Sequence, residues 1–310
     1  MTTVLEDLYP SRVGGVCELH ERTDPVVYTK GPPARGLTAD QAKQFDRDGF
    51  LVLEGLLSDE EVEALETEVQ RLATSKAVLE SESAITEPTS GALRSLFYVH
   101  MVSKVLDLLS RDRRLLDVAT HILGGEVYIH QSRINLKPGF AGKEFYWHSD
   151  FETWHVEDGL PRMRTLSASV LLTDNYPFNG PLMLIPGAHR TFVACPGETP
   201  ADNYKTSLKR QDLGVPDDAT LTRLVEEHGI AAPIPKAGSV LFFDSNAMHG
   251  SNGNITPYPR HNVFFVYNSV ENTPQDPFSG LPPRPDFIAN RSDFTPLAPE
   301  TPDYPSLVIS

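Results

Sequence analysis

Cysteine is scarce in this chain of 310 residues, which contains only Cys17 and Cys195. This scarcity excludes a fold held together by a disulfide framework, and both thiols are expected to be reduced. No apolar run approaches the roughly 20 residues that a membrane-spanning helix requires. The first residues also lack the basic and apolar regions of a signal peptide. The expected location is therefore the cytoplasm, with no membrane partner.

Positive charge is also in short supply, because 27 Lys and Arg residues stand against 42 Asp and Glu residues, a formal net charge of −15. Nucleic acids and anionic membranes both attract basic surfaces, so no nucleic-acid partner is expected. The remaining composition, with 40% hydrophobic residues, is that of a globular protein with a substantial core. The sequence leaves the oligomeric state open, with a homodimer as one alternative.

Both tryptophans of the chain lie in residues 145–155, around the triplet His148-Ser149-Asp150. On an extended strand, His148 and Asp150 would share one face and offer two neighbouring ligands to a metal ion. His249, which follows a predicted strand, is the predicted third ligand. A His-x-Asp triplet alone is weak evidence. Two histidines and one carboxylate, however, form the facial triad of non-haem Fe(II) oxygenases, which leaves coordination positions open.

An arginine suited to a carboxylate follows this third ligand. Arg260 lies eleven residues after His249, where another strand is predicted to begin. Its planar guanidinium group could bind the distal carboxylate of a dicarboxylic keto acid through two parallel hydrogen bonds, and Ser251 could add a hydroxyl donor. Considered alone, an arginine that follows two nearby prolines would rather be interpreted as a surface residue.

Residues 126–136 are predicted to form a strand with an unusual polar face. Gln131, Arg133 and Asn135 occupy alternate positions, so their side chains share that face. Such a row is normally solvated. Here it precedes the predicted metal-binding strand by a short turn, so lining of a polar pocket is an equal alternative.

The predicted architecture is mainly β with helical decoration: a double-stranded β-helix, the jelly-roll or cupin-like barrel. Capping sequences at Thr38 and Ser58 predict helices behind them, and residues 101–123 predict one or two more. Further strands are expected at residues 50–53, 165–173, 181–185, 239–243 and 262–270. Residues 191–236 are interpreted as a polar insertion with one helix, near residues 217–227.

The predicted domain organisation is a single catalytic domain over residues 37–295. An irregular N-terminal arm, residues 1–36, precedes it, and a proline-rich tail, residues 296–310, follows it. Within the domain, residues 75–100 are polar and are interpreted as a flexible loop or lid, with disorder as an equal alternative. Residues 271–310 contain many prolines, so they are expected to form a wrapping tail or a partly disordered segment rather than part of the core.

The order His-x-Asp, His, Arg resembles that of the 2-oxoglutarate-dependent Fe(II) dioxygenases, in their phytanoyl-CoA-hydroxylase-like branch. The continuous run from Trp147 to Arg164 is similar, more narrowly, to that of the ectoine hydroxylases. The resemblance covers about residues 40–295. It implies hydroxylation of ectoine to 5-hydroxyectoine, with Fe(II), 2-oxoglutarate and O2 and with release of succinate and CO2. This is a step of compatible-solute synthesis.

The resemblance also implies a role for each site residue. It implies that iron is held by His148, Asp150 and His249. It implies that 2-oxoglutarate meets Arg260 and Ser251 at its distal carboxylate and is lined by Arg133, Asn135 and Phe145. It implies that ectoine contacts Gln131, Thr153, Trp154, Phe243 and Phe264. Trp154 could equally be a core residue, and without the resemblance Phe243 and Phe264 would be interpreted as core.

Two alternatives remain at this stage. The same chemistry could act on another small amino-acid-like substrate or on an acyl-CoA, although the acidic composition disfavours the phosphates of the latter. The chain could instead be a non-catalytic jelly-roll protein with a structural metal. A closed structural site would need four protein ligands, and the sequence offers no fourth at a suitable spacing.

Overall fold

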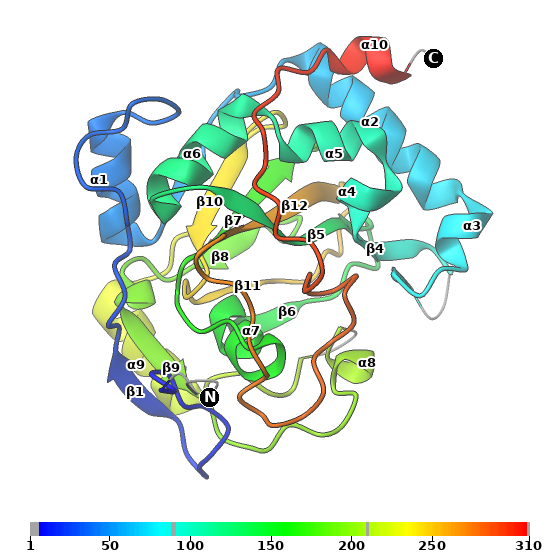
Figure 1. Cartoon of the computed structure of the whole chain (residues 1–310). Coiled ribbons are helices and arrows are strands. Elements are labelled where there is room, and N and C mark those ends of the chain that lie inside the picture. The colour runs from blue at the N-terminus through cyan, green and yellow to red at the C-terminus, as the bar shows by residue number, and fades with distance from the viewer. Residues whose placement is uncertain (1–5, 88–90, 209–210, 309–310) are drawn as a thin grey trace.

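The computed structural model describes residues 6–87, 91–208 and 211–308 (Figure 1). The strands are β1 (Glu18–Glu21), β2 (Phe50–Leu53), β3 (Ala84–Thr86), β4 (Leu93–Phe97), β5 (Val127–Lys137), β6 (Phe145–His148), β7 (Thr165–Leu171), β8 (Leu182–Leu184), β9 (Thr191–Ala194), β10 (Val240–Asp244), β11 (His249–Ser251) and β12 (Arg260–Ser269). The helices are α1 (Ala39–Asp48), α2 (Asp59–Thr74), α3 (Lys76–Leu79), α4 (Val99–Val102), α5 (Lys104–Ser110), α6 (Arg113–Leu123), α7 (Asp150–Asp158), α8 (Tyr204–Ser207), α9 (Asp218–His228) and α10 (Tyr304–Val308). A 3₁₀ helix covers Ala188–Arg190.

Two antiparallel sheets form the barrel. The larger has the strand order β2-β10-β7-β12-β5-β4-β3 and the smaller has the order β6-β11-β8, while β1 and β9 form a separate pair. Strands of the larger and of the smaller sheet line one cavity, so these two sheets face each other. This arrangement is the predicted double-stranded β-helix.

Alternation along the strands of the larger sheet separates the core from the cavity. On β12, Val263 and Phe265 are fully buried in the main hydrophobic cluster, while Phe264 between them lines the cavity. On β5, Ile134 belongs to the cluster, while Arg133 lines the cavity. Helices α2, α5 and α6 contribute to the same cluster, so they cover the face of this sheet that is turned away from the cavity (Figure 1).

Both predicted capping boxes begin helices. The Thr38 side chain accepts a hydrogen bond from the backbone N–H of Gln41 at the start of α1, and Ser58 accepts one from Glu61 at the start of α2. In each box the third helical residue returns a bond to the backbone of the capping residue. Within the described residues, no helix is long and apolar enough to cross a membrane.

The expectation of a loop or lid at residues 75–100 is wrong. This stretch contains α3, β3 and β4, and all five residues of β4 are buried. Strand β4 pairs with β5 and so extends the larger sheet. The sequence of this stretch is polar, and the pairing of β4 with a distant strand leaves no local sequence signal that would predict a strand. Residues 88–90 of this stretch lie outside the described part of the chain.

The two ends of the chain are better integrated than expected. The N-terminal arm was predicted to be irregular, but it contains β1, which pairs with β9. Residues 1–5 of the arm lie outside the described part of the chain. Within residues 271–310, Ile288 and Tyr304 are fully buried, so the expectation that this stretch stays out of the core is wrong. The Tyr304 hydroxyl donates a 2.7 Å hydrogen bond to Asp112, and Tyr304 packs in the main cluster.

Candidate active site

The first two candidate ligands lie on either side of a strand-to-helix junction. His148 is the last residue of β6, whereas Asp150 is the first residue of α7. The prediction that both occupy one strand face is therefore wrong. Ser149 between them is the N-cap, and its hydroxyl accepts a hydrogen bond from the backbone N–H of Glu152. The Ser-x-x-Glu spacing of this cap is visible in the sequence and could have placed the helix start.

The three candidate ligands nevertheless converge. His249, on β11, pairs with His148 across the smaller sheet, with 4.3 Å between the ring centroids. One Asp150 oxygen lies 3.6 Å from His148 Nε2, and the other lies 4.0 Å from His249 Nε2. One ligand atom of each residue lies within 4.8 Å of the others, so all three can reach one ion.

The orientation of both imidazoles suits a metal. Nδ1 of His148 lies 2.7 Å from the carbonyl oxygen of Tyr146, and Nδ1 of His249 lies 2.9 Å from that of Ala247. A carbonyl can only accept, so each Nδ1 carries a proton, and in the neutral imidazole the lone pair is then on Nε2. Both Nε2 atoms face Asp150, which is the arrangement of metal-ligating histidines fixed by a backbone acceptor.

Electrostatics keep these groups in the protonation states that a cation requires. Burial alone would raise the pKa of Asp150, but the imidazoles of His249 and His148 lower it well below the ordinary value. Burial, reinforced by the charge of His148, lowers the pKa of His249 to about 4. Near neutral pH the site therefore offers a carboxylate and a neutral His249, which are metal ligands rather than an ion pair.

A cavity of about 270 Å³ opens from the three ligands. All the other residues assigned to the site by the sequence line it as well, and they come from both sheets and from α7. These are Gln131, Arg133, Asn135, Phe145, Thr153, Trp154, Phe243, Ser251, Arg260 and Phe264. The polar row on β5 therefore faces a pocket rather than solvent.

Arg94, Arg133 and Arg260 line the cavity and, with the adjacent Lys137, form a basic cluster. Arg260 is 3% exposed and Lys137 is 2% exposed, and the Lys137 ammonium group donates a 2.9 Å hydrogen bond to Ser251. Burial, followed by the charges of Arg260 and Arg94, lowers the pKa of Lys137 to about 6. Burial, followed by the charge of Arg133, lowers the pKa of Arg260 to about 10. A bound anion would offset the repulsion between these neighbouring positive charges.

Orphaned polar atoms indicate where that anion would bind. Among the described residues, three N–H donors, Nε and Nη1 of Arg260 and Nε of Arg133, are buried without a hydrogen-bond partner. Unsatisfied donors of this kind are rare in folded proteins and typically mark the position of a ligand. The donor set thus fits a carboxylate at Arg260, and the open three-ligand centre fits a divalent ion such as Fe(II).

The sequence did not predict the cavity residues Glu157 and Arg284, or Lys137, which bonds the lining residue Ser251. Lys137 continues the alternate-residue row of Gln131, Arg133 and Asn135 by one step, so a longer β5 would have revealed it. Arg284 belongs to the proline-rich segment. Its guanidinium group reaches the cavity because Asp158, at the end of α7, binds it at 2.7 and 2.5 Å. No local sequence pattern predicts the contact between Arg284 and Asp158.

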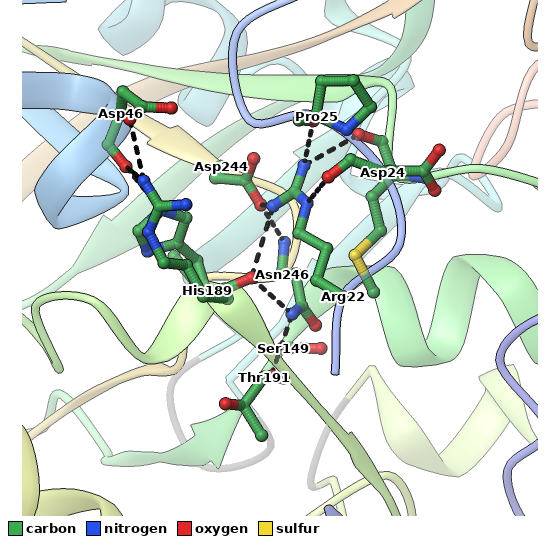
Figure 2. A network of polar contacts seen from close by, with 12 residues as sticks. Arg22, Asp24, Pro25, Asp46, Ser149, His189, Thr191, Asp244 and Asn246 are labelled. Atoms are coloured by element: carbon green, nitrogen blue, oxygen red, sulfur yellow. Dashed lines mark hydrogen bonds and ion pairs between the residues drawn. The ribbon is translucent and has the colours of Figure 1, made fainter. Parts of the chain in front are cut away.

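A buried polar network holds the turn that leads to His249 (Figure 2). The Arg22 guanidinium group donates a 2.8 Å hydrogen bond to Asp244, the last residue of β10. The same Asp244 oxygen accepts a 2.8 Å bond from the backbone N–H of Asn246. The Asn246 side chain donates in turn to the carbonyl of His189 at 2.9 Å. The N-terminal arm therefore fixes the turn between Asp244 and His249.

Replacing Asp244 with alanine is expected to lower the free energy of unfolding by about 3–5 kcal/mol, because Arg22 would remain buried without its counter-charge. Chemical denaturation measures the loss. The matched control is Asp48→Ala, which removes the surface pair with the exposed Arg47 and should cost far less. Equal losses in the two variants would contradict a special contribution from the buried network.

The fold and the site together define a class of protein. Two histidines and one carboxylate lie between the sheets of a double-stranded β-helix, beside a buried basic cluster. This combination is typical of the non-haem Fe(II) dioxygenases that use an oxo acid.

Comparison with known proteins narrows the class. The profile of the phytanoyl-CoA dioxygenase (PhyH) family matches residues 45–262. The ectoine dioxygenase of Bordetella parapertussis is 58% identical over 299 residues, which cover 96% of this chain and 97% of that protein. That of Sphingopyxis alaskensis is 54% identical, with 96% and 97% covered. The chain belongs to the phytanoyl-CoA dioxygenase family, in the group that includes the ectoine dioxygenases.

Solved structures agree with this placement. The crystal structure of EctD from S. alaskensis with 2-oxoglutarate and 5-hydroxyectoine superposes with a TM-score of 0.87 at 51% identity, over 95% of this chain and 98% of that one. The structure of the same enzyme with bound Fe gives a TM-score of 0.86 at 50% identity, with the same coverage.

Proposed function

We propose that this protein hydroxylates ectoine to 5-hydroxyectoine, with consumption of 2-oxoglutarate and O2 and release of succinate and CO2. The observation that carries the proposal is that one cavity joins an open three-ligand centre to a buried basic cluster with unsatisfied donors. The ectoine dioxygenases, at up to 58% identity over nearly the whole chain, support the choice of substrate.

In this proposal Fe(II) is held by His148, Asp150 and His249. When bound, the iron supplies the activation of O2, coupled to oxidative decarboxylation of 2-oxoglutarate. The role of the protein is to hold both substrates beside the open positions. The backbone acceptors of Tyr146 and Ala247 keep the two Nε2 lone pairs directed at the ion, so the ligands need no rearrangement when it binds.

The basic end of the cavity binds the distal carboxylate of 2-oxoglutarate. Arg260 contributes its unsatisfied Nε and Nη1 donors, and Ser251 contributes its hydroxyl. Lys137, which bonds Ser251, would gain its positive charge beside a bound carboxylate, because a neighbouring anion favours the protonated amine. Arg133, Asn135 and Phe145 line the path from this end to the iron.

Ectoine occupies the opposite side of the cavity, next to α7. It is a small zwitterion with a delocalised amidinium group and a carboxylate. Aromatic faces suit the amidinium, with a gain of about 0.5–2 kcal/mol for each cation–π contact, and Trp154, Phe243 and Phe264 supply such faces. Gln131 and Thr153 supply polar contacts, and the buried guanidinium group of Arg284 is suited to the carboxylate.

The proposal is tested by succinate release from purified protein with Fe(II), 2-oxoglutarate and air. Succinate should form in quantity only with ectoine, and the product should carry one oxygen atom from labelled O2. Turnover with other small amino-acid-like substrates or acyl-CoA, but not with ectoine, would overturn the substrate assignment. Absence of turnover with every substrate would favour a metal-binding protein without catalysis.

We infer a cytoplasmic location and keep a homodimer as the candidate assembly. The ectoine dioxygenase relatives support a role in compatible-solute synthesis, which draws on cytoplasmic 2-oxoglutarate. Fractionation of cells and light scattering of the purified protein test the two statements separately.

Replacing Lys137 with methionine is expected to change stability and cosubstrate binding in opposite directions. In the absence of 2-oxoglutarate the variant should be more stable, because burial of this amine is unfavourable, as its lowered pKa indicates. The apparent KM for 2-oxoglutarate should rise about tenfold, because one charge near its distal carboxylate is lost. Thermal melts and steady-state kinetics measure the two effects. Loss of stability together with unchanged KM would place Lys137 outside the cosubstrate site.

The same amine gives the ligand-free protein a pH dependence. The folded pKa of Lys137 is about 6 and its ordinary value is 10.5, so between these values the unfolded chain binds one more proton than the folded chain. This contribution makes stability rise with pH across that window. The Lys137→Met variant should lose this part of the pH dependence.

A further inference from the structure

A buried arginine of the N-terminal arm forms ion pairs with the helix that carries Asp150. Arg12 is only 6% exposed, and its Nε and Nη2 atoms donate hydrogen bonds of 2.9 and 2.7 Å to the two carboxylate oxygens of Glu152 on α7. Its Nη1 atom donates a 2.6 Å bond to Glu157, one turn and a half further along. The neighbouring Ser11 hydroxyl adds a 2.7 Å bond to Glu152.

Helix α7 forms one wall of the cavity. Asp150, Thr153, Trp154 and Glu157 all line it, at the spacing that places side chains on one helical face. Arg12 reaches this face directly, because its Nη2 atom lies 3.2 Å from the hydroxyl oxygen of Thr153. The guanidinium group is therefore one side chain away from the proposed ectoine site.

The same guanidinium group connects this wall to a third segment of the chain. Arg12 Nη1 donates a 3.1 Å bond to the Thr199 hydroxyl. The Glu157 oxygen bound by Arg12 also accepts a 2.7 Å bond from Asn203, which lines the cavity. Gly214 packs so closely that a Cβ there would lie 2.3 Å from Glu152. The arm, α7 and the residues Thr199, Asn203 and Gly214 therefore lie around one cation.

The backbone at Arg12 is strained in a way that these contacts explain. Its φ of 59° lies in the left-handed region, which is uncommon for residues other than glycine. A 2.8 Å bond from its N–H to the carbonyl of Cys195 holds this conformation. Strain of this kind persists where the surrounding contacts enforce it, and it is concentrated at functional sites.

We propose that Arg12 is a positioning residue for ectoine: it holds Thr153, Glu157 and Asn203 in place, so that the N-terminal arm completes the substrate side of the cavity. The proposal rests on the proposed function. It predicts that Arg12 governs ectoine binding and the coupling of the two half-reactions, and that it leaves iron and 2-oxoglutarate binding intact. A misplaced substrate still permits 2-oxoglutarate to be consumed but is hydroxylated less often.

The test compares wild type with Arg12→Lys and Arg12→Met. In Arg12→Met, the KM for ectoine should rise about tenfold or more, and the ratio of 5-hydroxyectoine to succinate should fall. Iron content and the KM for 2-oxoglutarate should stay within about twofold. Arg12→Lys keeps the charge but cannot bridge two carboxylates, so its values should lie between the other two.

Two further variants keep the result decisive. Arg35→Met removes an exposed arginine from the same arm and should leave all these values unchanged. Glu157→Gln weakens the bond to Arg12 without touching the arm, and it serves if Arg12→Met does not fold. A merely structural Arg12 would lower the melting temperature and the active fraction, with unchanged ectoine KM and unchanged coupling, and that outcome overturns the proposal. Failure of the proposed function would appear separately, as wild type without ectoine-dependent succinate.

Discussion

Asp150→Ala is expected to abolish iron binding and, with it, all ectoine-dependent formation of succinate. Asp150 is the only charged ligand of the three, and its oxygens lie 3.6 and 4.0 Å from the two imidazole Nε2 atoms. Without it the ion would have two neutral ligands and no counter-charge. Since loss of an outer-shell partner alone weakens metal binding by about 10–100-fold, loss of a direct ligand should exceed that range.

Anaerobic titration with ferrous ion and measurement of iron content after desalting would quantify this loss. Glu144→Ala is the matched control, because Glu144 lines the same cavity but is not one of the three converging groups. Circular dichroism should show that Asp150→Ala remains folded, since Ser149 caps α7 without the carboxylate. Near-normal iron content in Asp150→Ala would refute the triad.

The parts of the site that the sequence could reveal are those encoded by local periodicity. Gln131, Arg133 and Asn135 alternate along β5, so their common face was predictable, and the choice between solvent and pocket was the open question. The helical position of Asp150 was also encoded locally, by the cap at Ser149. It was missed because the strand pattern of residues 145–148 was extended by two residues.

The parts that could not be predicted depend on contacts between distant segments. Arg12 meets Glu152 and Glu157 across about 140 positions of sequence, and Arg22 meets Asp244 across 222. Neither arginine belongs to a local motif, and an arm with glycine and proline breaks predicts irregular structure. Burial of both arises only when the arm lies along the barrel, where desolvated carboxylates already require a cation.

These contacts divide the site into two halves with different support. The smaller sheet and Asp150 would hold the iron, and the basic cluster lies at the ends of β5 and β12, whereas the rest of α7, Arg12, Thr199 and Asn203 support the side assigned to ectoine. The two halves should therefore respond to mutation separately. Changes at Arg12 should appear in ectoine parameters, and changes in the basic cluster should appear in 2-oxoglutarate parameters.

Arg260→Ala should show this separation most strongly. Two charge-assisted hydrogen bonds to a carboxylate, at about 1.5–3 kcal/mol each, correspond to a rise of about 100-fold or more in the KM for 2-oxoglutarate. The KM for ectoine should change by less than about threefold, because Arg260 is assigned to the distal carboxylate of 2-oxoglutarate and not to ectoine. Steady-state kinetics with each substrate varied in turn measure both values.

A truncated cosubstrate makes the test of Arg260 specific. 2-Oxopentanoate has the same chain length but lacks the distal carboxylate, so wild type should strongly prefer 2-oxoglutarate over it. In Arg260→Ala this preference should collapse, since the group that distinguishes the two acids has been removed. Arg260→Lys should recover only part of it, because an ammonium group cannot form the paired bonds. If the preference persisted in full in Arg260→Ala, the carboxylate would be bound by another residue, with Lys137 the first to examine.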